Sequence, residues 1–375
     1  MTKVKSFKGI TLIALVITII ILLILAGISI SALTNQGLFE KAKDAKKKSE
    51  NAEKEQSQTL SEYETALDQF DEKTLAYKVN NENIKVGEYV KYTPDDVTDT
   101  SGILKLLSEY SGYTDRNTQD TLSQEKDLNW RILDIVDGKV RLISDKPTNS
   151  TIALKGWNGY NNAVYLIDDV CKTLYSNKSY ANSVQNLKIE DIQNVMLKDY
   201  TKLEYSNYGE TSSPKSKNYP SIFAQEEGQE VDGKIGALGL SKQDKLIKQT
   251  TVNTAKSWNV KCTYWYCELK AEDYKKPIYR NLFIEDENKN HYEGYWLSSR
   301  CIMVDESIDS TGFKIRYIPK WGDGPDGQEL ANGSSEWENV VEGRSYKFRP
   351  VITLNSNVQV KSGKGTQESP YEIGI

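Results

Sequence analysis

The sequence predicts an α+β chain in which one long N-terminal helix precedes a β-rich head with short helices. Three observations predict this class: residues 10–33 contain no charged side chain, residues 38–73 repeat small and apolar residues at helical spacing, and short apolar runs separated by turn residues follow Tyr77. The period of the apolar residues is the main sequence signal for helix or strand. We therefore expect four parts: a leader at 1–9, a transmembrane helix at 10–33, a charged helical stem at 34–79 and a globular head at 80–375.

The apolar run 10–33 predicts a helix that crosses a membrane. About 20 apolar residues suffice for a helix to span the hydrocarbon layer. The run is also longer than the apolar part of a secretory signal, which covers about 7 to 15 residues. We expect a single-pass membrane protein in contact with the lipid bilayer, and an uncleaved signal anchor is the simplest form of it.

The junction Lys8-Gly9-Ile10-Thr11-Leu12-Ile13 resembles a type IV prepilin leader. The resemblance implies that a prepilin peptidase cuts between Gly9 and Ile10, that Ile10 becomes the methylated first residue, and that pilin-like subunits are partners. The family usually carries a glutamate fifth in the mature chain, where this sequence has Ala14. A buried carboxylate is costly in a membrane unless it is paired, so Ala14 eases membrane residence but removes the docking charge of the family.

The lysines that flank the apolar run do not agree on the orientation of the chain. Positive residues favour the cytoplasmic side of a membrane helix. Three lysines precede the run and five follow it, at Lys41, Lys43, Lys46, Lys47 and Lys48. The count favours a cytoplasmic head, whereas the prepilin-like junction implies an extracellular head at the cell surface, which is the orientation we expect.

The region 38–73 predicts a helix that continues the membrane segment. Small, polar and apolar residues alternate there at spacings of four and three, as in a heptad repeat: Leu38, Ala42, Ala45, Ser49, Ala52, Gln56, Thr59, Tyr63, Ala66 and Phe70. At a rise of 1.5 Å per residue, a helix over 10–73 would be about 95 Å long. A single solvated helix held by Glu/Lys pairs is the alternative to a bundle of stems.

The head shows strand signals joined by turns. The dipeptide Asp137-Gly138 separates apolar strands at 130–136 and 139–143, which is the strongest hairpin signal of the chain. Further predicted strands are 83–92, 262–269, 294–304, 312–318 and 345–354. Predicted helices are 161–176, 188–198 and 241–249, and the polar region 200–235 is expected to be a loop.

Four motifs of the head resemble the C-type-lectin-like domains of bacterial and phage surface proteins, which share the fold of formylglycine-generating enzymes. The motifs are Trp130-Arg-Ile-Leu133, Gly294-Tyr-Trp-Leu-Ser-Ser-Arg300, Phe348-Arg-Pro-Val-Ile352 and Gly365-Thr-Gln-Glu-Ser-Pro-Tyr-Glu-Ile373. The resemblance implies a non-catalytic head that displays a surface for binding or adhesion, with a protein or a glycan as ligand.

Composition favours recognition over nucleic-acid binding. The net charge is −5 and the pI is near 5.4, which gives no basic footprint for nucleic acid. Tyrosines number 23 and tryptophans 7, and both residue types supply large contact areas with a polar handle. We expect the binding residues to be Trp321, Trp337, Tyr264 and Tyr266, while Trp130 and Trp296 belong to the core.

No motif in the sequence predicts catalysis, a cofactor or a metal. The only histidine, His291, lies in a polar stretch without a serine or cysteine motif and is expected to be a loop residue. The turn with Asp323, Asp326 and Glu329 lacks the spacing of an EF-hand. The four cysteines, Cys171, Cys262, Cys267 and Cys301, allow two disulfides or remain buried free thiols.

Two alternatives remain from the sequence alone. One is a membrane-tethered enzyme of the formylglycine-generating type, which needs a reactive cysteine pair that Cys262 and Cys267 do not match by motif. The other is a single-pass sensor whose head lies in the cytoplasm.

Overall fold

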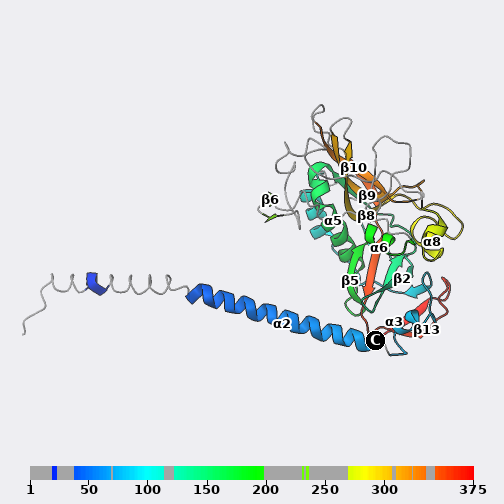
Figure 1. Ribbon diagram of the computed structural model, residues 1–375, viewed down its shortest axis with the longest axis horizontal. Helices are drawn as coiled ribbons and strands as arrows, with labels where there is room; N and C mark the ends of the chain where they lie inside the picture. The colour runs from blue at the N-terminus through cyan, green and yellow to red at the C-terminus, as the bar shows by residue number, and fades with distance from the viewer. Residues whose placement is uncertain are drawn as a thin grey trace, which may run out of the picture. The chain divides into compact units, whose positions relative to one another are not determined.

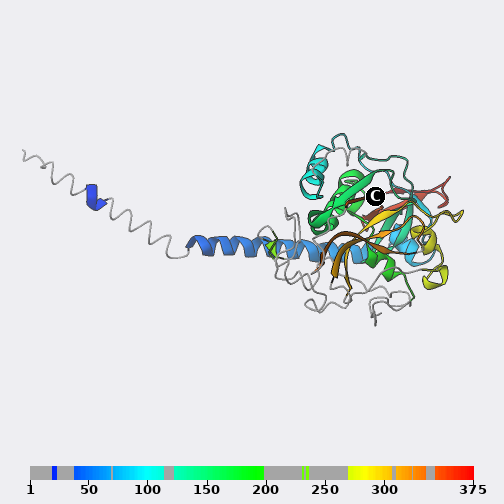
Figure 2. The same cartoon turned by 90° about the horizontal axis from the view of Figure 1, so that it is seen from above.

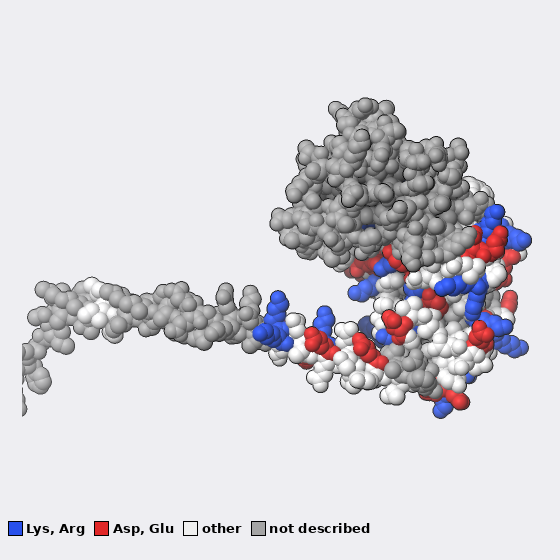
Figure 3. Space-filling view, in the orientation of Figure 1, with Lys and Arg blue, Asp and Glu red and all other residues white. Residues whose placement is uncertain are grey.

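The computed structural model shows a chain of two compact units, Met1–Glu64 and Thr65–Ile375. It describes residues 19–22, 38–68, 71–113, 122–197, 230–231, 234–235, 269–305, 310–322, 324–334 and 343–375. Acidic and basic side chains are intermixed on the described surface of Figure 3.

The first unit corrects the predicted fold class and membrane location. Its main element is α2 (Leu38–Asp68), a helix of 31 residues rich in Lys and Glu that ends just past the boundary of the unit, and a short helical stretch is described at 19–22. Among the described residues, no helix combines the length and the apolar character needed to cross a membrane. The prediction of one long helix through the membrane and the stem, and of the single-pass membrane location that rested on it, is therefore wrong, although the charged helix predicted at 38–73 is present as α2.

The physical reason lies in what the hydropathy of a sequence measures. An uncharged run shows that a segment tolerates lipid, but a span also requires a continuous helix of about 20 residues. The described helix α2 lies in the predicted charged stem, and its described side chains are exposed. Residues 10–18 and 23–33, with the predicted cleavage site at Gly9 and Ile10, lie outside the described residues.

The second unit contains two large sheets (Figure 1). The seven-stranded sheet has the order β13 (Gln359–Ser362), β14 (Tyr371–Gly374), β1 (Tyr89–Lys91), β2 (Trp130–Val136), β3 (Lys139–Ser144), β12 (Pro350–Leu354) and β5 (Ala181–Asn186). The five-stranded sheet has the order β10 (Asp326–Ser334), β9 (Ser310–Ile318), β8 (Tyr295–Asp305), β11 (Gly343–Lys347) and β4 (Thr151–Lys155). A short pair, β6 (Glu230–Val231) and β7 (Lys234–Ile235), lies within the predicted loop 200–235.

Helices alternate with these strands along the chain, so the class is mixed α/β and not a β-rich head. They are α3 (Leu75–Asn80), α4 (Ser101–Tyr110), α5 (Gly156–Tyr175), α6 (Ile189–Asn194), the 3₁₀ helix η4 (Ala271–Asp273) and α8 (Ile278–Phe283). The helix α5 contacts strands of both sheets, as Figures 1 and 2 show. This 20-residue helix packs on both sheets and so forms a layer of the core. The strand signals of the sequence did not predict that layer.

The strand alternation of the sequence divides the core into two clusters. Ile132, Leu142 and Ile352 pair across β2, β3 and β12 and share the cluster that contains the buried face of α5. Their neighbours Leu133, Ile143 and Val351 point to the opposite face of the sheet, into a second cluster with α6 and α8. Side chains alternate across a strand with a period of two, so both faces of this sheet are buried.

Several local predictions are confirmed. The hairpin β2–β3 turns at Asp137 and Gly138, whose φ angles of 48° and 71° fit a type I′ turn. The helix predicted at 161–176 begins earlier, at Gly156, and the helix predicted at 188–198 is shorter. The strand predicted at 345–354 is divided between β11 and β12 of different sheets. Trp130 and Trp296 are buried in the core, as expected.

Candidate functional site

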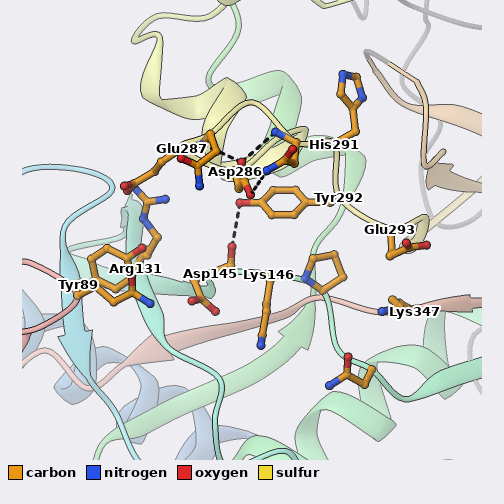
Figure 4. A pocket seen from close by; sticks show the side chains of 15 residues that line it. Tyr89, Arg131, Asp145, Lys146, Asp286, Glu287, His291, Tyr292, Glu293 and Lys347 are labelled. Carbon is orange, nitrogen blue, oxygen red and sulfur yellow. Dashed lines mark hydrogen bonds and ion pairs between the residues drawn. The ribbon is translucent and has the colours of Figure 1, made fainter.

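A cavity of about 400 Å³ lies in the second unit, where segments of both sheets meet. We call it the polar pocket (Figure 4). Its walls come from β1, β2, the segment after β3, the loop between α8 and β8, the end of β11 and the loop between β13 and β14. The lining residues are Tyr89, Arg131, Asp145, Lys146, Pro147, Asn149, Asp286, Glu287, Asn288, Asn290, His291, Tyr292, Glu293, Lys347 and Gln367.

Arg131 is fixed at one end of the polar pocket. Its side chain is only 5% exposed although it belongs to the apolar strand β2. The Nε atom donates a hydrogen bond to the carbonyl oxygen of Gly87 at 2.7 Å, and the guanidinium lies 5.0 Å from the centre of the Tyr89 ring. These contacts come from β1 and the turn before it, so the position of the cation does not depend on a ligand.

Tyr292 is held in place by hydrogen bonds of its hydroxyl and by a cation near its ring. Its hydroxyl lies 2.9 Å from the carbonyl oxygens of both Asp145 and Asn281, and the Arg349 guanidinium lies 4.5 Å from its ring centre. Burial raises the pKa of Tyr292, and the Arg349 charge opposes that rise. Burial likewise raises the pKa of Tyr89. Both phenols therefore stay protonated at neutral pH.

The loop Asp286–Asn290 forms the upper wall in Figure 4. The carboxylate of Asp286 accepts hydrogen bonds from the backbone N–H groups of Asn288 (2.8 Å) and Asn290 (2.9 Å), and from the Asn290 side chain. Slight burial raises the pKa of Asp286, but these hydrogen bonds outweigh it and the pKa lies below the ordinary 3.8. Lys289 adopts a positive φ of 64° in the turn. The backbone that carries Glu287 is thus preformed.

The charged side chains of the pocket differ in their ion-pair and hydrogen-bond partners. Glu293 pairs with Lys320 at 2.5 Å, and Lys146 pairs with Asp127 at 3.4 Å. Glu287 pairs with Arg131 at 3.4 Å, and Asp145 accepts a hydrogen bond from the Asn129 side chain. Lys347 forms no ion pair with any residue that the structure describes. The pocket thus presents both positively and negatively charged side chains.

The lining residues suit binding of a polar molecule. Charged and amide side chains with two aromatic rings can fix a ligand by hydrogen bonds while the rings cover its apolar face. Among the described residues that line the pocket there is no Ser, Thr or Cys to act as a nucleophile. In the described parts of the chain, no group of three or more His, Cys, Asp or Glu is arranged to hold a metal.

The predicted binding residues are not brought together in the described chain. Trp321 lies in the turn between β9 and β10 with 79% of its surface exposed, and the Lys320 ammonium lies 5.2 Å from its ring centre. Its predicted exposure is confirmed, and its contact with a ligand stays a prediction. Trp337, Tyr264 and Tyr266 lie outside the described residues.

The structure describes only some of the four cysteines, and their surroundings are known to different extents. Cys171 is a free thiol buried on α5, and burial, with the nearby Asp168 charge, raises its pKa well above the ordinary value. Such a thiol is unreactive at neutral pH. Cys301 is placed in β8 by its backbone, and Cys262 and Cys267 lie outside the described residues. The predicted choice between disulfides and free thiols is thus decided for Cys171 alone.

The sequence reasoning missed most of the polar pocket. It identified His291 as a loop residue, which agrees with its place in the wall, but it gave no role to Tyr89, Arg131 or Lys347. One signal was present: an arginine directly after Trp130 and before an apolar strand is costly to bury without a specific purpose. The remaining lining residues come from segments that are far apart in the chain, so no single sequence pattern connects them.

In comparison with known proteins, no family model, curated protein or solved structure matches this chain. The prepilin-like and lectin-like resemblances therefore rest on their short motifs alone.

Proposed function

We propose that the second unit is a binding module that holds a small polar molecule in the polar pocket without converting it. The observation that carries this proposal is the preformed character of the walls. Arg131, Tyr292 and the loop at Asp286 are each fixed by contacts made within the protein. Groups that are already ordered lose little entropy when a ligand binds, so modest contacts suffice for affinity.

Two further features support binding over catalysis. Burial raises the pKa values of the pocket-lining phenols of Tyr89 and Tyr292, so neither provides a phenolate base at neutral pH. The lining residues of both charge signs provide orientation for a polar molecule, which is a common basis of specificity.

The test is a binding screen on the full chain. Thermal melts with a panel of sugars, amino acids and organic acids should show saturable stabilisation by at least one compound. The variants Lys347→Gln and Gln367→Ala should weaken the binding of that compound at least about tenfold, which corresponds to about 1.4 kcal/mol. The compound should be recovered unchanged.

The matched control is Lys178→Gln, which makes the same substitution at an exposed lysine that does not line the pocket. It should bind the compound as the wild type does. Absence of stabilisation by every compound, or equal binding by all three variants, would contradict the proposal.

A further inference from the structure

The charge at the Arg131 end of the polar pocket is only loosely neutralised. The guanidinium is buried, and its ionic partner Glu287 lies 3.4 Å away with 64% of its side chain exposed. A charge-assisted hydrogen bond between such groups usually measures about 2.7 to 2.9 Å. A largely exposed partner also contributes little to the stability of an ion pair. Replacement of the Glu287 carboxylate by another carboxylate at Arg131 therefore costs little free energy.

Two other acids at the site, Asp286 and Glu293, are committed to contacts within the protein. Asp145 accepts a hydrogen bond from Asn129 through one oxygen, and its buried Oδ1 has no hydrogen-bond partner in the described chain. The Asp286 carboxylate holds the backbone N–H groups of its own loop, and Glu293 pairs with Lys320. By contrast, Lys347 faces the same cavity and pairs with no acid in the described chain. Figure 4 shows Glu287 reaching towards Arg131 at one end of the pocket and Lys347 at the other.

We propose that the ligand of the polar pocket carries a carboxylate group that displaces Glu287 from Arg131, with Lys347 as a second cationic contact. Glu287 then acts as an internal competitor that occupies the anion position when no ligand is bound. This inference rests on the binding function proposed above and names the chemical class of its ligand. A carboxylate is the favoured anion because the group it replaces is itself a carboxylate.

The test uses the full chain and a matched pair of probes, D-glucuronate and D-glucose, which share a sugar ring and differ in the carboxylate. Titration calorimetry should show glucuronate binding at least about tenfold more tightly than glucose. The variant Glu287→Gln should bind glucuronate about five- to tenfold more tightly than the wild type, because the competitor has lost its charge. Glucose affinity should be the same in both proteins.

Two variants complete the design. Lys347→Gln should weaken glucuronate binding about tenfold, and Glu272→Gln, which neutralises an exposed acid that does not line the pocket, should leave it unchanged. Inorganic phosphate serves as the competing oxyanion. Tighter binding of phosphate than of glucuronate by Glu287→Gln would overturn the assignment of a carboxylate.

The outcomes separate this inference from the binding function itself. If glucose, or another neutral member of the panel, binds as tightly as glucuronate, the carboxylate inference fails and the binding function stands. If Glu287→Gln binds glucuronate no better than the wild type, or if neither protein binds it, the inference also fails. The binding function fails when the whole panel gives no stabilisation, or when the pocket variants bind the stabilising compound as the control variant does.

Discussion

At the scale of single residues, Asn186 connects four elements of the core. Its side-chain nitrogen donates to the carbonyl oxygens of Leu187 (3.1 Å) and Trp296 (2.9 Å), and its side-chain oxygen accepts from the backbone N–H of Arg349 at 2.7 Å. The same oxygen lies 3.9 Å from the thiol of Cys171. One fully buried amide thereby joins β5, β8 and the start of β12 to α5.

We expect Asn186→Ala to lower the free energy of unfolding by about 3 kcal/mol, because it leaves several buried polar groups without a partner. Urea unfolding of the full chain measures this change. Asn355→Ala is the control, since that side chain makes one exposed hydrogen bond to Ser179, and it should cost less than about 1 kcal/mol. Equal effects of the two substitutions would show that Asn186 is not a link between the elements.

Tyr295 gives the core a dependence on alkaline pH. Burial raises its pKa to about 12, against the opposing effect of the Arg349 charge, and its hydroxyl donates to the carbonyl oxygen of Phe283 at 2.7 Å. The folded pKa exceeds the ordinary value of 10. The protonated phenol therefore stabilises the fold fully below pH 10, and this contribution is lost as the pH rises from 10 through about 12.

The variant Tyr295→Phe lacks this titration. At pH 9 it should be less stable than the wild type by about 1 kcal/mol, the usual net value of one hydrogen bond. As the pH approaches 12, the difference between the two proteins should shrink, because only the wild type loses stability through this group. Urea unfolding at intervals of pH provides the measurement, and a difference that stays constant would contradict the assignment.

At the scale of the element, the β2–β3 hairpin depends on its turn. Gly138 has a φ of 71°, a region where a side chain costs about 1 to 2 kcal/mol. Gly138→Ala should lower the stability of the second unit by that amount. Gly102→Ala is the matched control, because Gly102 lies in α4 with open space around it and alanine favours helix. It should be neutral or stabilising in the same thermal melt, and a loss as large as that of Gly138→Ala would refute the turn argument.

At the scale of the whole molecule, α3 extends the compact part of the chain into the predicted stem. Leu75 and Ala76 are buried in the core, and the backbone N–H of Leu75 donates to the carbonyl oxygen of Val358 at 2.8 Å. Thr74 also pairs with Gln359 of β13. The strand β14, which continues from β13, pairs with β1, so the two ends of the second unit depend on one another.

A fragment of residues 65–375 should therefore unfold in one cooperative transition, whereas a fragment of residues 81–375 should be less stable by at least about 3 kcal/mol. Removal of a buried leucine side chain alone costs about 2 to 5 kcal/mol. Calorimetry of the two fragments measures the cooperativity of unfolding and the difference in stability. Equal melting temperatures would mean that α3 is not part of the core.

The elements that the sequence predicted well are those whose signal is local. Asp137-Gly138 fixes a two-residue turn through its own backbone preferences, and the apolar positions 167, 171 and 174 of α5 repeat at helical spacing and are buried. The prediction of a membrane helix at 10–33 used hydropathy alone, and no helix among the described residues supports it. The sequence likewise did not predict that β11 and β12 belong to different sheets. Only two residues separate these strands, and the segment 345–354 was therefore predicted as a single strand.

The sequence by itself determined the hairpin, the buried stripe of α5 and the core positions of Trp130 and Trp296, because neighbouring residues carry the free-energy differences that decide such features. Only the tertiary structure decided the polar pocket. Its walls come from Tyr89, Arg131, the loop at Asp286, Lys347 and Gln367, which no sequence period connects. Chain topology brings these segments together, and the low exposure of Arg131 beside an exposed Glu287 is a property of that arrangement alone.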